Sequence, residues 1–193
     1  MIQYTLHKDF LEINAQEWND LLKESVNDSP FLRHEYQSTW WEHRGGGEWM
    51  QAELVLVTAR ENEKLIGIAP LFISNHDGQS VLLLNGSIEI SDYLDLIVRM
   101  DDHARFLTGL LDFLASALPI SWRGLDWYNL PDSSPTLAAL KAESAERGWT
   151  HLEEMYRPTP RIALNGDFDE YLGRVEKKQR HEIRRKMRRA EES

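Results

Sequence analysis

Cysteine is absent from the 193 residues of this chain. Disulfides, thiolate metal ligands and a cysteine nucleophile are therefore excluded. Long apolar runs are absent too, since no segment approaches the roughly 18 residues that a membrane-spanning helix needs. The first residues also lack the basic start and apolar stretch of a signal peptide. These absences make the cytoplasm the expected location.

Positive charge is scarce until the last part of the chain. The sequence has 22 Lys and Arg against 32 Asp and Glu, a formal net charge of -10. From Arg174 to Arg189, nine basic residues stand against only Glu176 and Glu182, whereas the residues before Arg174 carry 13 basic and 28 acidic side chains, a net charge of -15. This asymmetry of sign indicates an interaction surface. Because the body is acidic, nucleic acid is not the expected partner.

Hydrophobic residues make up 41% of the chain and include seven Trp, which suits one packed domain. The predicted helices cover Ala15–Ser25, His34–Arg44, Asp101–Leu118 and Ser134–Arg147, with a further basic helix from Phe168 onward. The predicted strands cover Ile2–Leu6, Ala52–Arg60, Lys64–Ser74, Ser80–Leu84, Tyr93–Val98, Trp122–Leu130, Thr150–Tyr156 and Arg161–Leu164. This order predicts an α/β domain with a mostly antiparallel central sheet flanked by helices.

Capping and helix-breaking residues refine the predicted ends of these helices and strands. Asn14, Asp167 and Gly148 are placed to cap helices. Three consecutive glycines from Gly45 predict the end of the second helix. Pro70 lies late in its strand and predicts a bulge or a sheet edge there, because proline cannot donate a backbone hydrogen bond.

Several short motifs follow one another in a definite order along the chain. They are Trp18-Asn19-Asp20-Leu21-Leu22, Ser29-Pro30-Phe31-Leu32, Trp40-Trp41, Gly67-Ile68-Ala69-Pro70-Leu71, Ser91-Asp92-Tyr93-Leu94-Asp95, and Lys177-Lys178-Gln179-Arg180 with Arg184-Arg185-Lys186. Together with the order of elements, they resemble the Fem-like tandem GNAT acetyltransferases, including the CelD-like proteins associated with cellulose biosynthesis. The resemblance covers nearly the whole chain, and it is carried by the order of the motifs rather than by any one of them.

This resemblance implies a GNAT-like lobe over residues 1–166, followed by a basic helix over residues 167–193 that leads into a C-terminal catalytic lobe outside this sequence. The full protein would transfer an acetyl or other acyl group from acyl-CoA to an amine or hydroxyl of an envelope or polysaccharide-related acceptor. Its partners would be the second lobe and a small-molecule, glycan or peptide acceptor. This chain alone would be inactive, and its terminal helix could form a homodimer.

An acyl-CoA site of this kind needs a glycine-rich turn before a helix, where backbone N–H groups hold the pyrophosphate. Between Asn85 and Asp102 the sequence offers only Gly86. The same stretch carries five acidic residues, Glu89, Asp92, Asp95, Asp101 and Asp102, which would repel an anion. We therefore expect acetyl-CoA to be a co-substrate of the full protein that does not bind this lobe.

Two groups of residues are candidates for binding the acceptor. Asp92, Tyr93 and Asp95 either line an acceptor groove, with a carboxylate as general base, or cap a turn and pack. Lys177, Arg180, Arg184 and Arg185 either contact an anionic acceptor or form a solvated basic face that docks on the acidic lobe. No catalytic residue is assigned, and the seven His show no metal-binding spacing.

Two other functions remain open from the sequence. The chain is alternatively a non-catalytic binding module whose basic helix contacts an anionic partner, such as a nucleic acid or a membrane surface. It is alternatively a single-lobe acyltransferase with a degenerate CoA site.

Overall fold

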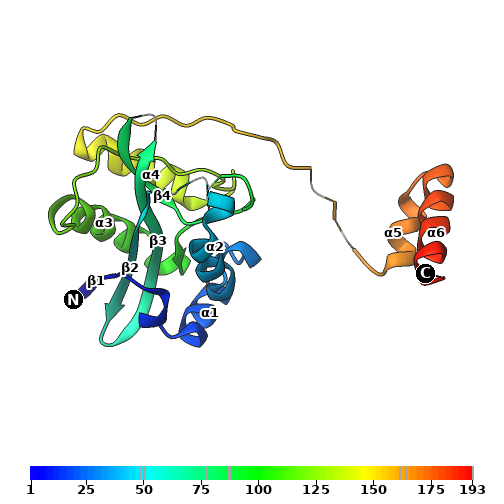
Figure 1. Cartoon of the computed structure of the whole chain (residues 1–193), viewed down its shortest axis with the longest axis horizontal. Coiled ribbons are helices and arrows are strands. Elements are labelled where there is room, and N and C mark those ends of the chain that lie inside the picture. Colours follow the sequence, from blue (N-terminus) through cyan, green and yellow to red (C-terminus); the bar gives the residue numbers. More distant parts are fainter. Residues whose placement is uncertain are drawn as a thin grey trace. The chain divides into compact units, whose positions relative to one another are not determined.

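The computed structural model describes residues 1–47, 49, 51–76, 78–86, 88–160, 162–163 and 165–192, with the backbone alone for 45–47. The chain divides into two compact units, Met1–Tyr156 and Arg157–Ser193. The first unit is a mixed α/β structure in which helices flank a mostly antiparallel sheet (Figure 1). The predicted fold class is thus confirmed at this level.

The sheet follows the order β1-β2-β3-β4-β6 among the described residues. Its strands are β1 (Ile2–His7), β2 (Glu53–Glu61), β3 (Lys64–His76), β4 (Gln79–Leu84) and β6 (Gly124–Leu125), and β5 (Ile97–Val98) pairs with β3 beside this path. The pairs are antiparallel except for β4 with β6, which is parallel. The hairpin of β2 and β3 is the one that the sequence predicts.

β4 and β5 lie one after the other along the same side of β3. β4 pairs with Leu71–His76 and β5 pairs with Gly67–Ile68, so the pairing is interrupted around Pro70. The Pro70 carbonyl accepts a hydrogen bond from the Asn85 amide at 2.8 Å, but proline has no N–H to donate in return. Pro70 therefore marks the interruption of pairing, whereas the register shift of the hairpin lies between Ala59 and Arg60.

The helices of the first unit begin and end at recognisable signals. They are η1 (Phe10–Glu12), α1 (Ala15–Lys23), η2 (Pro30–Leu32), α2 (His34–Gly47), α3 (Met100–Ser116) and α4 (Pro135–Arg147). The Asn14 side chain accepts hydrogen bonds from two backbone amides at the start of α1, and Gly148 ends α4 with a left-handed φ of 67°. The predicted end of α2 before Gly45 is wrong, since a glycine weakens a helix but does not forbid it.

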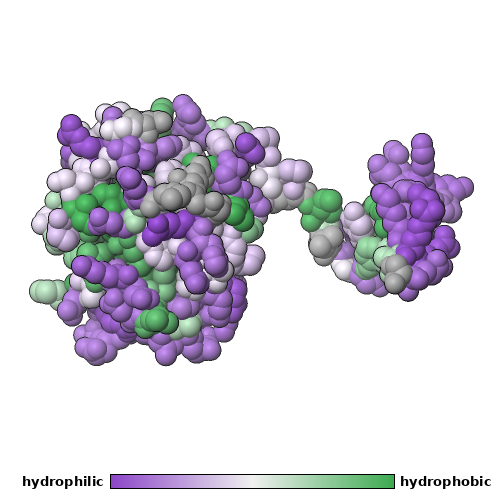
Figure 2. All heavy atoms as spheres, in the orientation of Figure 1, coloured by the Kyte–Doolittle hydropathy of each residue, from purple (hydrophilic) through white to green (hydrophobic). Residues whose placement is uncertain are grey.

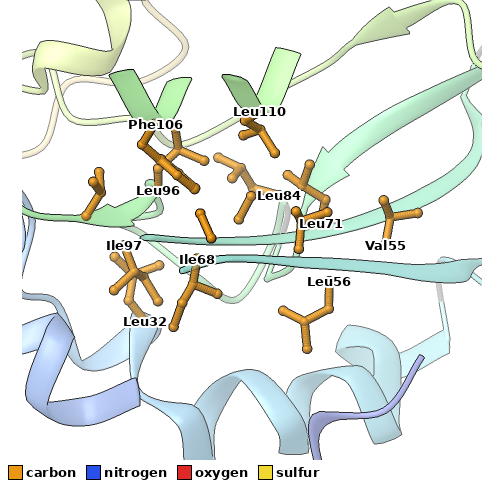
Figure 3. Packing of buried hydrophobic residues seen from close by; sticks show 14 of the residues in the cluster. Leu32, Val55, Leu56, Ile68, Leu71, Leu84, Leu96, Ile97, Phe106 and Leu110 are labelled. Carbon is orange, nitrogen blue, oxygen red and sulfur yellow. The ribbon is translucent and has the colours of Figure 1, made fainter. Parts of the chain in front are cut away.

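The main core lies on both faces of the sheet. Phe106 and Leu110 reach the sheet from α3, while Leu56 points to the opposite side, toward the N-terminal helices (Figure 3). α3 comes so close to β3 that a Cβ added at Gly67 would overlap the Phe106 ring. Trp40 is buried in a second cluster around Phe72, and the neighbouring Trp41 is partly exposed.

The second unit contains α5 (Phe168–Arg174) and α6 (Lys177–Glu191). Asp167 caps α5 as predicted, because its side chain accepts a hydrogen bond from the Glu170 amide. The prediction of one continuous helix is wrong, because the backbone turns out of the helix at Val175 and Glu176. The two short helices bury Leu172, to 1% exposure, which a single helix in water would leave exposed.

Two predicted strands are shorter than expected, one is absent, and a fourth is only partly described. Tyr93–Val98 forms strand only at Ile97–Val98, and Trp122–Leu130 only at Gly124–Leu125. No strand forms over Thr150–Tyr156, because the described sheet ends at β6. In the predicted strand Arg161–Leu164, the two end residues lie outside the described residues, and 162–163 are not extended strand.

Candidate functional site

The parallel strands β4 and β6 separate after two residue pairs. Val81 pairs with Gly124 and Leu82 pairs with Leu125, and the Asp126 amide donates to the Leu82 carbonyl at 2.9 Å. No further pairing joins the two strands within the described residues. The region outside the carboxyl ends of parallel strands is where α/β proteins commonly bind ligands.

In this protein, the residues that follow β4 bond to Asn129, which follows β6. These residues, 85–86 and 88–96, are called here the inserted segment. The Leu94 amide donates to the Asn129 carbonyl at 3.0 Å, and the Asn129 side-chain amide donates to the carbonyls of Ile88 at 2.9 Å and Ser91 at 2.5 Å. Leu94 is fully buried. Backbone groups that a ligand would need at this position are therefore already satisfied by the protein.

Asp95 fastens the inserted segment to the start of α4. Its buried carboxylate accepts hydrogen bonds from the hydroxyls of Ser134 and Thr136, both at 2.6 Å, and from the Leu96 amide at 2.8 Å. The Thr136 hydroxyl oxygen also lies 2.9 Å from His103 Nε2. Because the single Thr136 proton points to Asp95, we assign the proton of this second bond to His103 Nε2.

Burial shifts the pKa values of Asp95 and His103, which lie at the two ends of this hydrogen-bond network. Burial raises the pKa of Asp95, although the hydrogen bonds from Ser134, Thr136 and Leu96 act in the opposite direction. Burial lowers the pKa of His103, which favours a neutral imidazole. An enclosed carboxylate whose oxygens are already bonded has no direct path to an acceptor, so the geometry favours capping over general-base catalysis for Asp95.

The other two candidates in the inserted segment have different surroundings. Asp92 is exposed. Tyr93 is half-buried, and its ring packs on Phe31 with centroids 6.2 Å apart and planes at 52°. Phe31 in turn meets Tyr36, whose hydroxyl lies 2.9 Å from Ser91 Oγ. The three candidates thus share one segment, but they do not converge on one pocket.

The start of α3 is a poor match for the pyrophosphate of an acyl-CoA. Asp101 and Asp102 occupy its first turn, and the N-cap residue Arg99 makes no side-chain cap bond. Asp102 pairs with Arg105, which also donates to Glu61 at 2.7 Å. Carboxylates at this end already use the positive pole of the helix dipole, and they would repel a second anion. The residues at the start of α3 therefore do not fit the pyrophosphate of an acyl-CoA.

A His–Asp pair that the sequence reasoning missed lies at the end of β3. His76 Nδ1 is 2.5 Å from Asp126 Oδ2, and their side chains are 25% and 36% exposed. The His76 ring meets Trp49 at 5.5 Å and Tyr128 at 6.0 Å between centroids, both edge to face. A carboxylate bound at Nδ1 leaves Nε2 as the proton acceptor, which is the arrangement of a general base. The partners are 50 residues apart with no motif around them, so the sequence held no signal.

The basic candidates all lie on α6. Arg180 donates to the carbonyls of Val175 at 3.1 Å and Gly173 at 3.4 Å, and it thereby satisfies the end of α5. Arg184 lies 3.6 Å from Asp169 of α5. The other two, Lys177 and Arg185, are exposed. Arg180 and Arg184 therefore hold the helix pair together, which leaves other cations of α6 for a partner.

No protein-family model matches the sequence, and no curated protein matches it. Among solved structures, the chain is similar to a ribosomal-protein-alanine N-acetyltransferase from Brucella melitensis biovar Abortus 2308, at 15% identity and a TM-score of 0.44, over 83% of this chain and 99% of that one. It is also similar to an integron cassette protein from the mobile metagenome of V. cholerae, at 14% identity and a TM-score of 0.44, over 90% and 98% of the two chains. Neither likeness is close enough to transfer an activity.

Among the described residues, no group of three or more His, Asp and Glu side chains could hold a metal ion. Among the same residues, no helix is long and apolar enough to cross a membrane. A shallow depression of about 350 Å³ lies between α1, the start of β3 and Arg99, but Glu17 and Arg99 on its wall are already paired with Arg60 and Glu24.

Proposed function

We propose that the first unit is a GNAT-type lobe of an acyltransferase from the Fem-like branch. The enzyme would transfer an acetyl or other acyl group from acyl-CoA to an amine or hydroxyl of an envelope or polysaccharide-related acceptor. The order of elements carries this proposal: β1, two helices, the antiparallel strands β2 to β4, α3, then β6 parallel to β4, and α4. Through α4 this is the order that the resemblance in sequence implies. The strand pair expected to close the lobe is absent from the described residues.

The acyl-CoA would be held by a second GNAT lobe. Two features support the proposal that the second lobe, rather than this one, holds the acyl-CoA. The inserted segment, through its bonds with Asn129, occupies the position beside the carboxyl ends of β4 and β6. The first turn of α3 also presents Asp101 and Asp102 where a pyrophosphate would need N–H groups and no competing charge. This lobe would support the catalytic lobe and shape the acceptor side.

Release of free CoA tests the proposal. Two proteins would be assayed with acetyl-CoA and a panel of amine and sugar acceptors. One is the protein encoded by the complete reading frame that contains this sequence, and the other is the chain of 193 residues alone. A thiol reagent reports CoA release, and this chain adds no background because it has no cysteine. We expect acceptor-dependent release by the complete protein and none by the chain alone. Release by the chain alone, or a complete protein without a second GNAT lobe, would refute the proposal.

A further inference from the structure

One side of α6 is lined with cations. At 3.6 residues per turn, Lys177, Lys178, Arg185, Arg188 and Arg189 fall on one side of the helix, with His181 among them. All six side chains are exposed. These five cations are called here the basic face. Hydrophilic side chains cover the visible surface of this unit over α6 (Figure 2).

The opposite side of α6 is turned toward α5. Ile183 lies on that side and is half-buried, and Leu172 of α5 is buried. Arg180 and Arg184 also reach α5, through the Val175 carbonyl and the Asp169 carboxylate. The packing between the helices therefore fixes which way the basic face points, which is away from α5.

The charges of the basic face are mostly uncompensated. Arg185 pairs with Glu182, but Lys177, Lys178, Arg188 and Arg189 form no ion pair with any described residue. Lys177 and Lys178 also stand in the first turn of α6, where cations oppose the helix dipole. Neighbouring like charges on one helix face are unfavourable as well. Folding of the helix pair does not explain these residues, whereas an anionic partner does.

We propose that the basic face binds the phosphate backbone of a nucleic acid without reading its sequence. The face spans about 18 Å of helix, which is long enough to meet several successive phosphates. It carries no aromatic or large apolar anchor of the kind on which protein–protein interfaces depend. Away from the basic face, α6 carries two large apolar residues, Ile183, which is half-buried, and Met187, which is 42% exposed, so it lacks the broad apolar side with which an interfacial helix enters a bilayer. The acidic charge that argues against nucleic acid belongs to the first unit, and this binding is independent of the acyl-transfer proposal.

Salt-dependent binding of the whole chain tests the proposal. Fluorescence anisotropy would follow a labelled DNA duplex and an RNA duplex of about 20 base pairs, each in two unrelated sequences. Between about 50 and 200 mM salt, we expect affinity to fall about 150-fold for four phosphate contacts and about 500-fold for five. Sequences of equal length should bind equally.

Two variants with the same change in charge locate the surface. Changing Lys177, Lys178, Arg188 and Arg189 to Gln should abolish the steep salt dependence and weaken binding at low salt at least tenfold, while circular dichroism shows the helix content retained. The control changes four exposed basic residues of the first unit to Gln, namely Lys8, Lys64, Arg123 and Lys141. It should bind with an affinity within about threefold of the unmodified chain, because these residues lie outside the basic face.

Three results would overturn the proposal. The first is no binding to either nucleic acid at about 100 µM protein and low salt. The second is an equal loss of affinity in both variants, which would show a non-specific effect of net charge. The third is binding to vesicles rich in phosphatidylserine without binding to nucleic acid, which would assign the basic face to a membrane surface.

Discussion

Replacing Asp95 by Asn tests the energetic role of the buried carboxylate that fastens the inserted segment. Because burial raises the pKa of Asp95, the folded state holds this proton more tightly than the unfolded chain does. The contribution of Asp95 to stability is therefore greatest at low pH. It is lost as the pH rises from the unfolded pKa, about 3.9, through the higher folded pKa. Within that window the free energy of unfolding should fall by up to about 1.4 kcal/mol per pH unit.

The substitution removes this dependence, because asparagine does not titrate. Below the window, where Asp95 is protonated, Asp95→Asn should be less stable by about 1 kcal/mol, because the amide NH2 accepts no hydrogen bond from Ser134 or Thr136, whereas a protonated carboxyl keeps acceptor capacity. As the pH rises through the window, the difference in free energy of unfolding between the two proteins should shift in favour of the variant and then become constant. Urea unfolding at a series of pH values measures this difference. The other carboxylates are the same in both proteins, so their contributions cancel.

Asp92→Asn is the matched control for this experiment. Asp92 lies in the same inserted segment but is exposed, so its substitution should leave the pH dependence unchanged. Parallel stability curves for the unmodified chain and Asp95→Asn would contradict the reasoning. So would a difference that moves in favour of the unmodified chain as the pH rises.

Three further substitutions test the packing around the sheet, each measured by urea unfolding. Gly67→Ala should lower the free energy of unfolding by about 1–3 kcal/mol, because the added Cβ overlaps the buried Phe106 ring; unchanged stability would contradict the close approach of α3. Trp18→Phe should cost about 1–3 kcal/mol, because it removes the 2.8 Å bond from the indole N–H to the buried Leu32 carbonyl. Met100→Gln is the control, since Met100 is 62% exposed and its change should stay within about 0.5 kcal/mol.

Features that depend on near neighbours in the chain could be predicted from the sequence. Asn14 and Asp167 cap the helices that follow them, as expected from short polar side chains that accept bonds from amides two or three residues on. Gly148 ends its helix because glycine tolerates the left-handed conformation. The β2–β3 hairpin also formed as predicted, since its strands are joined by a short turn.

Features that depend on distant partners could not be predicted in this way. The run Thr150–Tyr156 has the composition of a strand, but among the described residues it pairs with neither end strand of the sheet, β1 or β6. Trp122–Leu130 pairs for only two residues because its backbone then leaves β4 to meet the inserted segment. The helix break at Val175 carries no proline or glycine at that residue, and it is favoured by the packing that buries Leu172.

The same distinction applies to the candidate sites. The basic face follows from helical spacing alone, because its residues share one helix. The hydroxyl partners of Asp95 lie 39 and 41 residues away, and the partner of His76 lies 50 residues away. Such pairs depend on how β3, β6 and α4 are placed in the fold, which local patterns do not specify.

Calorimetric titration of the chain with acetyl-CoA tests most directly whether its own inserted segment takes the place of an acyl-CoA. If the inserted segment, bonded through Leu94 and Asn129, occupies the position beside the carboxyl ends of β4 and β6, and Asp101 and Asp102 repel the pyrophosphate, the titration should give no saturable heat up to about 1 mM ligand. Saturable binding with one acetyl-CoA per chain would contradict the proposal that a second lobe holds the acyl-CoA.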